Sequence, residues 1–306
     1  MQEYSVLIGQ SDCYSKGSEI LSTFFPIKLG NTQIFRVTDF YGAQLEKERP
    51  SITGTLPTLA LSDCLYVQID GSMILTRTVG WHEVKLGRIF KGSDCIYKEK
   101  DSGHIKISQY FADMDTCKVF TDQMQKIIDS YGVLGKRLIF ISDGAPWIRK
   151  WINDNYPNAI SVLDYYHASE YLHKFVKEYF TETKSATKWC TYQLELLNEG
   201  GVTNVINNIK ALPNYENKGG QEIIRYYEKN KERMDYKYYK TVGAGLIGSG
   251  AIESAHRTVI QKRMKLSGQR WTEEGAQNML NLRTTHMNDQ WYKIQDLVKI
   301  NATRAA

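Results

Sequence analysis

Residues 65–76, LYVQIDGSMILT, decide the fold class of this chain. Every second residue from Leu65 to Ile69 is aliphatic, which is the period-two pattern of a β-strand. A second stretch, RLIFIS at 137–142, is short and continuously apolar, which is typical of a strand buried on both faces. In the first strand Gly71-Ser72 interrupts the pattern directly after Asp70, and the second strand ends at Asp143-Gly144. We therefore expect an α/β protein whose central sheet contains these two strands.

The other elements follow from the spacing of apolar residues along the chain. The resulting order is three strands, a helix, a strand, a helix and a strand. The first three strands would form an antiparallel meander, and the later two would be added in parallel through helical crossovers. This is the order of a ribonuclease H-like core, in which the first and fourth strands are neighbours. We predict the further strands over 83–90, 105–110 and 159–163, and helices over 116–131, 145–155, 272–286 and 289–299.

The sequence after His167 changes in character. Residues 168–242 are rich in Lys, Glu and Tyr and have helical spacing throughout, so we predict an all-helical insertion into the core. Residues 65–167 would then form the first part of the core, and 243–306 its closing helices, beginning near Ala251. Residues 1–64 have mixed patterning and form an N-terminal segment.

Composition excludes several classes of protein. The 306 residues carry a net charge of +5, which is weak evidence for a nucleic-acid partner. No run of about 18 apolar residues occurs, and the first ten residues do not resemble a secretory signal. The five cysteines are scattered and never spaced C-x-x-C, which argues against a disulfide framework or a cysteine zinc site. A reducing cytoplasm is the expected location.

Two aspartates, Asp70 and Asp143, lie at the ends of strands that we expect to be neighbours. Asp-Gly is a common turn pair, so a turn is the simplest interpretation of either residue alone. Held together, two carboxylates resist joint ionisation unless cations lie between them. Their hard oxygen ligands favour Mg²⁺ or Mn²⁺, and two such ions can bind the attacking and leaving oxygens of a phosphodiester displacement.

A third carboxylate, Glu253, lies in GSGAIESAHR at 248–257, where a helix is expected to begin. The helix dipole favours a glutamate in a first turn, which is the structural explanation for this residue. The functional interpretation makes it the third metal ligand. His256 lies three residues later on the same helix face, where it could hydrogen-bond a carboxylate or a phosphate.

Two further features are candidates for supporting roles. Asp164 and His167 form D-Y-Y-H at the end of the fifth strand, where they would either orient the site or position DNA, or else be purely structural. The stretch 256–270 is basic and contains no acidic residue, so it is either a solvated helix face or a phosphate-contacting surface. Its candidate DNA-binding residues are Arg257, Lys262, Arg263, Lys265 and Arg270.

Other catalytic signatures are missing from the sequence. The glycine-rich stretch 243–250 lacks G-x-x-x-x-G-K-[ST], so we reject a nucleotide-binding P-loop. Neither G-x-S-x-G nor H-E-x-x-H occurs, which leaves an α/β-hydrolase or a zincin without support. His167 and His173 have no cysteine at zinc-ligand spacing.

Several motifs together resemble insertion-sequence transposases of the Kra family and, more distantly, Mutator-like transposases. The resemblance extends over about residues 65–290, and its longest motif is GSGAIESAHRTVIQKRMKLSGQRWT. It implies a ribonuclease H-like fold with a DDE triad at Asp70, Asp143 and Glu253, and a helical insertion before the glutamate. The D-x-x-H motif of the Mutator-like group falls on Asp164 and His167. The other motifs are VQIDGSMI at 67–74, HEVKLGRIF at 82–90, ISDGAPWI at 141–148 and VLDYYHA at 162–168.

The expected function is therefore that of a DDE transposase, which cuts and joins double-stranded DNA at element ends and target with two Mg²⁺ or Mn²⁺ ions. We expect a homo-oligomer on DNA, associated with the nucleoid. Such transposases usually carry an upstream DNA-binding region, whereas only about 64 residues precede the first strand here. A truncated, catalytically inactive copy that binds DNA or a partner transposase is thus an alternative. A ribonuclease H-like nuclease acting on other nucleic acids is another.

Overall fold

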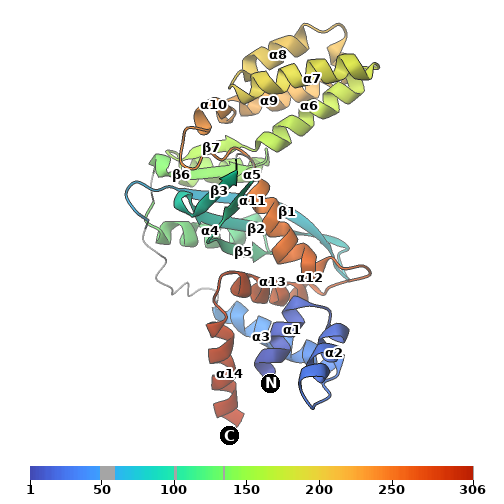
Figure 1. Cartoon of the computed structure of the whole chain (residues 1–306), viewed down its shortest axis with the longest axis vertical. Helices are drawn as coiled ribbons and strands as arrows, with labels where there is room; N and C mark the ends of the chain where they lie inside the picture. The colour runs from blue at the N-terminus through green and yellow to red at the C-terminus, as the bar shows by residue number, and fades with distance from the viewer. Residues whose placement is uncertain (49–58, 100–101, 134, 306) are drawn as a thin grey trace.

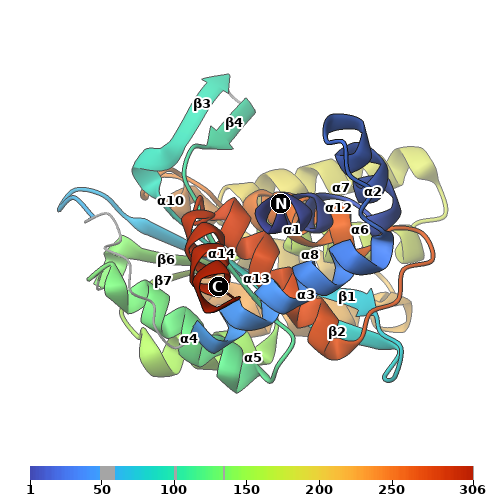
Figure 2. The same ribbon diagram turned by 90° about the horizontal axis from the view of Figure 1, so that it is seen from below.

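The computed structural model of the chain describes residues 1–48, 59–99, 102–133 and 135–305, and it has a mixed α/β architecture (Figure 1). A five-stranded sheet lies in the middle, with helices on both faces and at both ends. A separate two-stranded hairpin, β3–β4, projects from this body (Figure 2). The strands are β1 (Leu65–Leu75), β2 (Trp81–Lys91), β3 (Cys95–Glu99), β4 (Ser102–Ile105), β5 (Gln109–Asp113), β6 (Leu138–Ser142) and β7 (Ile160–Leu163).

The strand order in the large sheet is β5-β2-β1-β6-β7. Strands β1, β2 and β5 pair antiparallel, whereas β6 is parallel to β1, and β7 is parallel to β6. The predicted antiparallel meander with two added parallel strands is therefore confirmed. So is the prediction that the first and fourth strands are neighbours, because β1 pairs directly with β6 from Leu65↔Leu138 to Ile69↔Ser142.

Alternating side chains of β1 supply the two faces of the sheet. Leu65, Val67 and Ile69 pack against apolar residues of α4 (Cys117–Ser130) and α5 (Pro146–Asn155). The side chains of Tyr66 and, further along the strand, Ile74 point to the opposite face of the sheet. Near Ile74 that face is covered by α11 (Gly250–Ala255), the π-helical segment His256–Gln261 and α13 (Glu273–Met287). Asp70 is four residues from both Tyr66 and Ile74, so its side chain points to the same face of the strand, which α11 covers.

A group of helices follows β7 and projects from one end of the sheet (Figure 1). Their buried apolar side chains form one continuous core with the sheet residues Tyr66, Ile139 and Val162. They correspond to the helical segment predicted over 168–242, although the first helix begins three residues earlier. They are α6 (Tyr165–Tyr179), α7 (Thr183–Asn198), α8 (Val202–Lys210), α9 (Gly220–Asn230) and α10 (Tyr236–Tyr239).

The two chain ends lie together at the other end of the molecule (Figure 1). Apolar residues of the N-terminal helices, such as Val6 and Tyr41, share a core with Leu282 and Ile294 near the C-terminus. Residues 1–48, for which the sequence indicated only mixed patterning, are thus helical and packed on the closing helices. The N-terminal helices are α1 (Gln2–Ser11), α2 (Tyr14–Phe24) and α3 (Asn31–Glu48). The closing helices at this end also include α12 (Lys262–Met264) and α14 (Tyr292–Ala305).

The third strand differs from its prediction over 105–110. Strand β5 begins at Gln109, because the buried alternation starts at Tyr110 and Ala112, whereas Ile107 is 55% exposed. The preceding residues form the hairpin β3–β4, which the sequence analysis did not predict. No helix in the described ranges is long and apolar enough to cross a membrane. The five cysteines are free.

Candidate active site

Asp70 and Asp143 are the next residues after the last pair of the parallel β1–β6 ladder, Ile69↔Ser142. Their carboxylates therefore lie at the same level of two adjacent strands, where β6 ends. Asp143 follows a strand end as predicted, whereas Asp70 lies within β1, which continues to Leu75 because it stays paired with β2. The Gly71 amide donates to Asp70 Oδ1 at 2.7 Å, and the Ala145 amide donates to Asp143 Oδ1 at 3.0 Å. One oxygen of each carboxylate is thus used by a neighbouring backbone amide, and the second oxygen of Asp70 faces His256.

The two carboxylates are close enough to influence each other. The pKa of Asp143 is raised, chiefly because the carboxyl is buried and also because the negative charge of Asp70 opposes its ionisation. The backbone amide of Ala145 and the positive charges of His167 and Arg233 partly offset this rise. A cation between the aspartates would favour the ionised form of both.

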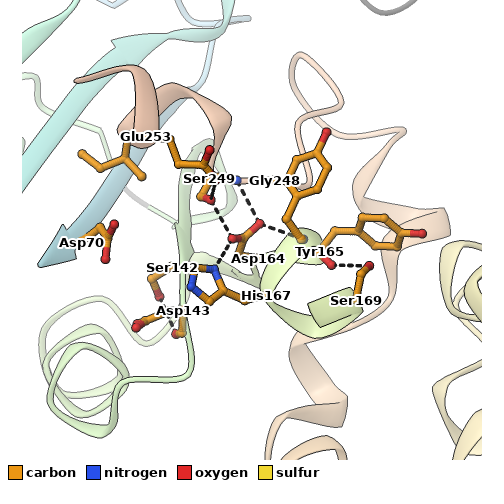
Figure 3. Close-up of polar contacts among 12 residues, drawn as sticks. Asp70, Ser142, Asp143, Asp164, Tyr165, His167, Ser169, Gly248, Ser249 and Glu253 are labelled. Carbon is orange, nitrogen blue, oxygen red and sulfur yellow. Dashed lines mark hydrogen bonds and ion pairs between the residues drawn. The ribbon is translucent and has the colours of Figure 1, made fainter. Parts of the chain in front are cut away.

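The third carboxylate, Glu253, is exposed on α11, the short helix over this face of the sheet (Figure 3). The Ser249 hydroxyl lies 3.2 Å from Glu253 Oε1 and 2.6 Å from Asp164 Oδ2. A hydroxyl has a single proton, so it donates to the nearer oxygen, that of Asp164. The Glu253 carboxylate is therefore left free to meet another partner.

Two buried polar side chains of the sheet hold the start of α11 in place. Gln68 Nε2 donates to the Gly248 carbonyl at 3.2 Å, and Gln68 Oε1 accepts from the Ile252 amide at 2.9 Å. Arg88 Nη1 donates to the Ala251 carbonyl at 2.6 Å. The sequence analysis did not identify either residue as part of the site, although a glutamine within an otherwise apolar strand was the available signal.

His256 joins the closing helix to Asp70. Its side chain is 6% exposed, and its Nε2 lies 3.2 Å from Asp70 Oδ2. Neither ring nitrogen makes a hydrogen bond within the described chain, because the Asp70 contact has the distance but lacks the angles of one. His256 begins a π-helical segment, His256–Gln261, a distortion that is frequent at functional sites.

Asp164 anchors three chain segments to one another (Figure 3). Its side chain is fully buried and caps α6 by accepting from the Tyr166 amide at 3.1 Å. It also accepts from Ser249 through the amide at 3.0 Å and the hydroxyl at 2.6 Å. His167 Nδ1 lies 2.5 Å from Asp164 Oδ2. The D-x-x-H residues thus orient the loop that leads to Glu253.

The hydrogen bonds around Asp164 determine the charge states of Asp164 and His167. Burial alone would raise the pKa of the Asp164 carboxyl, but hydrogen bonds from His167 and Ser249 outweigh it and lower that pKa. The hydrogen bond to Asp164 raises the pKa of His167 to about 9, against the opposing effect of burial. At neutral pH the pair is therefore an imidazolium beside a carboxylate.

The donor set suits a hard divalent cation, but it is not a closed cage. No group of three or more His, Cys, Asp or Glu in the described ranges is arranged to hold a metal ion. Mg²⁺ is commonly bound by one or two carboxylates, with waters and substrate phosphates as its other ligands. The carboxylates of Asp70, within β1, and Asp143, after the end of β6, are the oxygen ligands that such a site needs.

Comparison with known protein families places most of the chain in one group. Residues 19–299 match the Uncharacterised protein family (UPF0236). The chain belongs to this family. No curated protein matches it. The matched region of this UPF0236 member runs from α2 into α14 and so includes every candidate residue named above.

In this UPF0236 protein, only some of the basic residues of the stretch 256–270 are exposed at the surface. Arg257, Lys262 and Arg270 are exposed, and exposed Lys265 donates to the Ser72 hydroxyl at 2.6 Å. Arg263 corrects the prediction of an exposed phosphate contact, because its side chain is fully buried and its Nε donates to the Gly9 carbonyl at 2.8 Å. Its partner lies 254 residues away in sequence, so spacing within the stretch could not reveal the burial.

A cavity of about 630 Å³ opens beside the Asp164 anchor. Its walls include Tyr166 and Gly248 next to that anchor, Ser254 on α11, and Tyr97 and His104 from the β3–β4 hairpin. The helix that carries Glu253 therefore also borders an open space with aromatic and polar walls.

Proposed function

We propose that this protein is a DDE transposase that cleaves and joins double-stranded DNA, with Asp70, Asp143 and Glu253 as its catalytic carboxylates. The observation that carries the proposal is the position of Asp70 and Asp143 directly after the last β1–β6 pair, beneath the helix that bears Glu253. His256, at 3.2 Å from Asp70, links that helix to the first aspartate.

The topology supports a ribonuclease H-like core for this proposal. The sheet order β5-β2-β1-β6-β7 is a three-stranded antiparallel meander extended by two parallel strands. Helices α6 to α10 follow β7 and precede the glutamate, as an insertion in such a transposase would. The motifs that resemble Kra-family and Mutator-like transposases fall within β1 and β2, at the ends of β6 and β7, and on the segment that begins with α11.

The chain's own residues would bind and position the DNA. Two Mg²⁺ or Mn²⁺ ions held by the three carboxylates would neutralise charge at the attacking and leaving oxygens. Asp164 and Ser249 would hold the loop that precedes Glu253. The exposed cations after His256 would contact phosphates. Joining two element ends to a target would require a homo-oligomer on DNA.

A second candidate is a catalytically inactive relative that binds DNA or a partner transposase. It is favoured by the finding that the described residues contain no three-ligand group arranged for a metal. Both candidates predict DNA binding, and only the first predicts chemistry.

The deciding experiment is a cleavage and strand-transfer assay with Mg²⁺ or Mn²⁺ on duplex DNA carrying the sequences that flank the gene. We expect Asp143→Asn to lower the cleavage rate by about 10³-fold, since metal-ion stabilisation of the transition state contributes several kcal/mol. Asp154→Asn is the matched control, because Asp154 is an exposed carboxylate on α5, the helix that follows Asp143, where it pairs with Lys150. Wild-type protein that binds DNA but shows no cleavage would establish the inactive candidate.

A further inference from the structure

A second pocket, of about 450 Å³, lies between the N-terminal helices and the segment that follows α12. Three arginines line it, Arg77, Arg263 and Arg270, together with the aromatic rings of Tyr14, Phe35 and Trp271. No acidic side chain is among the described residues that line it. The pocket is therefore cationic, with aromatic walls.

Arg263 forms the buried base of this pocket. Its side chain is fully buried, and neither Nη1 nor Nη2 has a hydrogen-bond partner within the described chain. The guanidinium lies between two rings, 4.8 Å from the centroid of Tyr14 and 5.1 Å from that of Trp271. Such cation–π contacts are weaker than the hydrogen-bonded ion pair that a buried charge ordinarily has. Asp12 is near enough to favour its charge, but no carboxylate is hydrogen-bonded to this guanidinium within the described chain.

The other two arginines are exposed and are brought together by the backbone. The Trp271 amide donates to the Leu75 carbonyl at 3.1 Å, and the Arg77 amide donates to the Trp271 carbonyl at 2.8 Å, which adds this segment to the end of β1. Arg77 Nε also donates to the Arg270 carbonyl at 3.4 Å. Two exposed cations thus stand at the mouth of the pocket, and a buried one lies beneath it.

We propose that this pocket binds a phosphate group of a nucleic-acid strand. Exposed guanidinium groups make paired hydrogen bonds to phosphate oxygens, and the buried Arg263 strengthens the attraction through its field in a low-dielectric interior. The aromatic walls offer faces on which a base can stack. The assignment of DNA as the ligand of this pocket rests on the proposed function. Arg77 follows Asp70 by seven residues, which span about 23 Å in an extended chain, so one duplex could contact both residues.

The test measures duplex DNA binding by fluorescence anisotropy over a range of salt concentrations. We expect Arg77→Gln/Arg270→Gln to weaken binding about tenfold or more and to make the slope of log K against log salt shallower by about 0.9 for each phosphate that is no longer neutralised. Both residues are exposed, and the two backbone hydrogen bonds that join Trp271 to the end of β1 remain in the variant. The matched control is Arg225→Gln/Lys229→Gln, which removes two exposed cations from α9. Equal slopes for the two double variants would overturn the DNA contact.

A second arm distinguishes a nucleic-acid phosphate from free phosphate. The thermal stability of both double variants is compared in inorganic phosphate and in chloride of equal ionic strength. Stabilisation that is lost only in Arg77→Gln/Arg270→Gln, with DNA binding unchanged, would overturn the nucleic-acid source and leave a free-phosphate site. No effect in either arm would overturn the pocket itself. A changed salt slope in a protein without cleavage activity would retain the pocket and reject only the proposed chemistry.

Discussion

At the scale of single residues, the buried Asp164 connects the chemistry of the site to the stability of the fold. It caps α6, receives two hydrogen bonds from Ser249 and pairs with His167. All four donors reach one carboxylate, so its ionised form is stabilised although it is fully buried. A change in the charge of either partner of the His167 pair should therefore affect both folding and the position of Glu253.

The raised pKa of His167 predicts a pH dependence of stability. A histidine whose folded-state pKa is about 9, above its ordinary value of 6.5, stabilises the fold fully below pH 6.5 and loses that contribution as pH rises through 9. We expect His167→Gln to lower the free energy of unfolding at pH 6 by about 1 kcal/mol, because the half-exposed ring is partly screened. Urea unfolding at pH 6 and pH 9.5 measures this difference, which should shrink at the higher pH.

The control for this substitution is His104→Gln, on the exposed hairpin strand β4. If both variants lose the same stability at each pH, the Asp164 pair is not the source of the dependence.

Some of these residues were predictable from sequence and others were not. Asp70 and Asp143 could be paired because strand order alone makes the first and fourth strands neighbours, although Asp70 lies within its strand and not at the predicted end. Gln68 was missed because hydrogen bonds to Gly248 and Ile252 depend on a helix about 180 residues away. Local patterning carries no information on such partners.

At the scale of elements, the contact between the start of α6 and the loop before α11 includes one buried hydroxyl, that of Ser249. Ser249→Ala removes the donor to Asp164 Oδ2 and leaves that oxygen with one partner fewer. We expect a loss of about 1–3 kcal/mol in the free energy of unfolding, since a buried acceptor loses its bond. Ser254→Ala is the matched control on the same helix, where the serine is exposed and the change should stay within about 0.5 kcal/mol. Equal losses in chemical denaturation would contradict this role of Ser249.

The elements with strong apolar periodicity were predicted well, and those without it were not. Strands β1 and β6 carry buried aliphatic side chains at the expected spacing, so their positions agree with the prediction. The hairpin β3–β4 was missed because residues such as Ile96 and Tyr97 remain exposed, 39% and 52%, and no alternation marks them. Helix α3 is an exception: Ile34, Tyr41 and Leu45 recur at helical spacing, but the sequence analysis assigned this part of the chain only to an N-terminal segment of mixed patterning.

At the scale of the whole molecule, the two ends of the chain form one helical layer held by buried cations. Arg263 donates to the Gly9 carbonyl, and Arg283 donates to Gln10 through both the backbone carbonyl and the side chain. Burial lowers the pKa of Arg283 to about 10, which still leaves it charged at neutral pH. Such contacts span more than 250 residues, so sequence patterning could not distinguish an independent N-terminal segment from this packed layer.

A close approach of two helices within this layer gives a test of how tightly the two ends are joined. A Cβ added to Gly42 on α3 would lie 2.5 Å from the Asn278 carbonyl oxygen on α13, so the helices would have to separate. Alanine is intrinsically better in a helix than glycine by about 1 kcal/mol, but overpacking against backbone costs about 1–3 kcal/mol. We therefore expect Gly42→Ala to destabilise the protein and Gly250→Ala, at an α11 position with open space around it, to be neutral or stabilising. Thermal unfolding of the two variants decides the matter: a Gly42→Ala protein as stable as wild type would mean that α3 can move away from α13 at little cost, and that the N-terminal helices are a loosely attached segment.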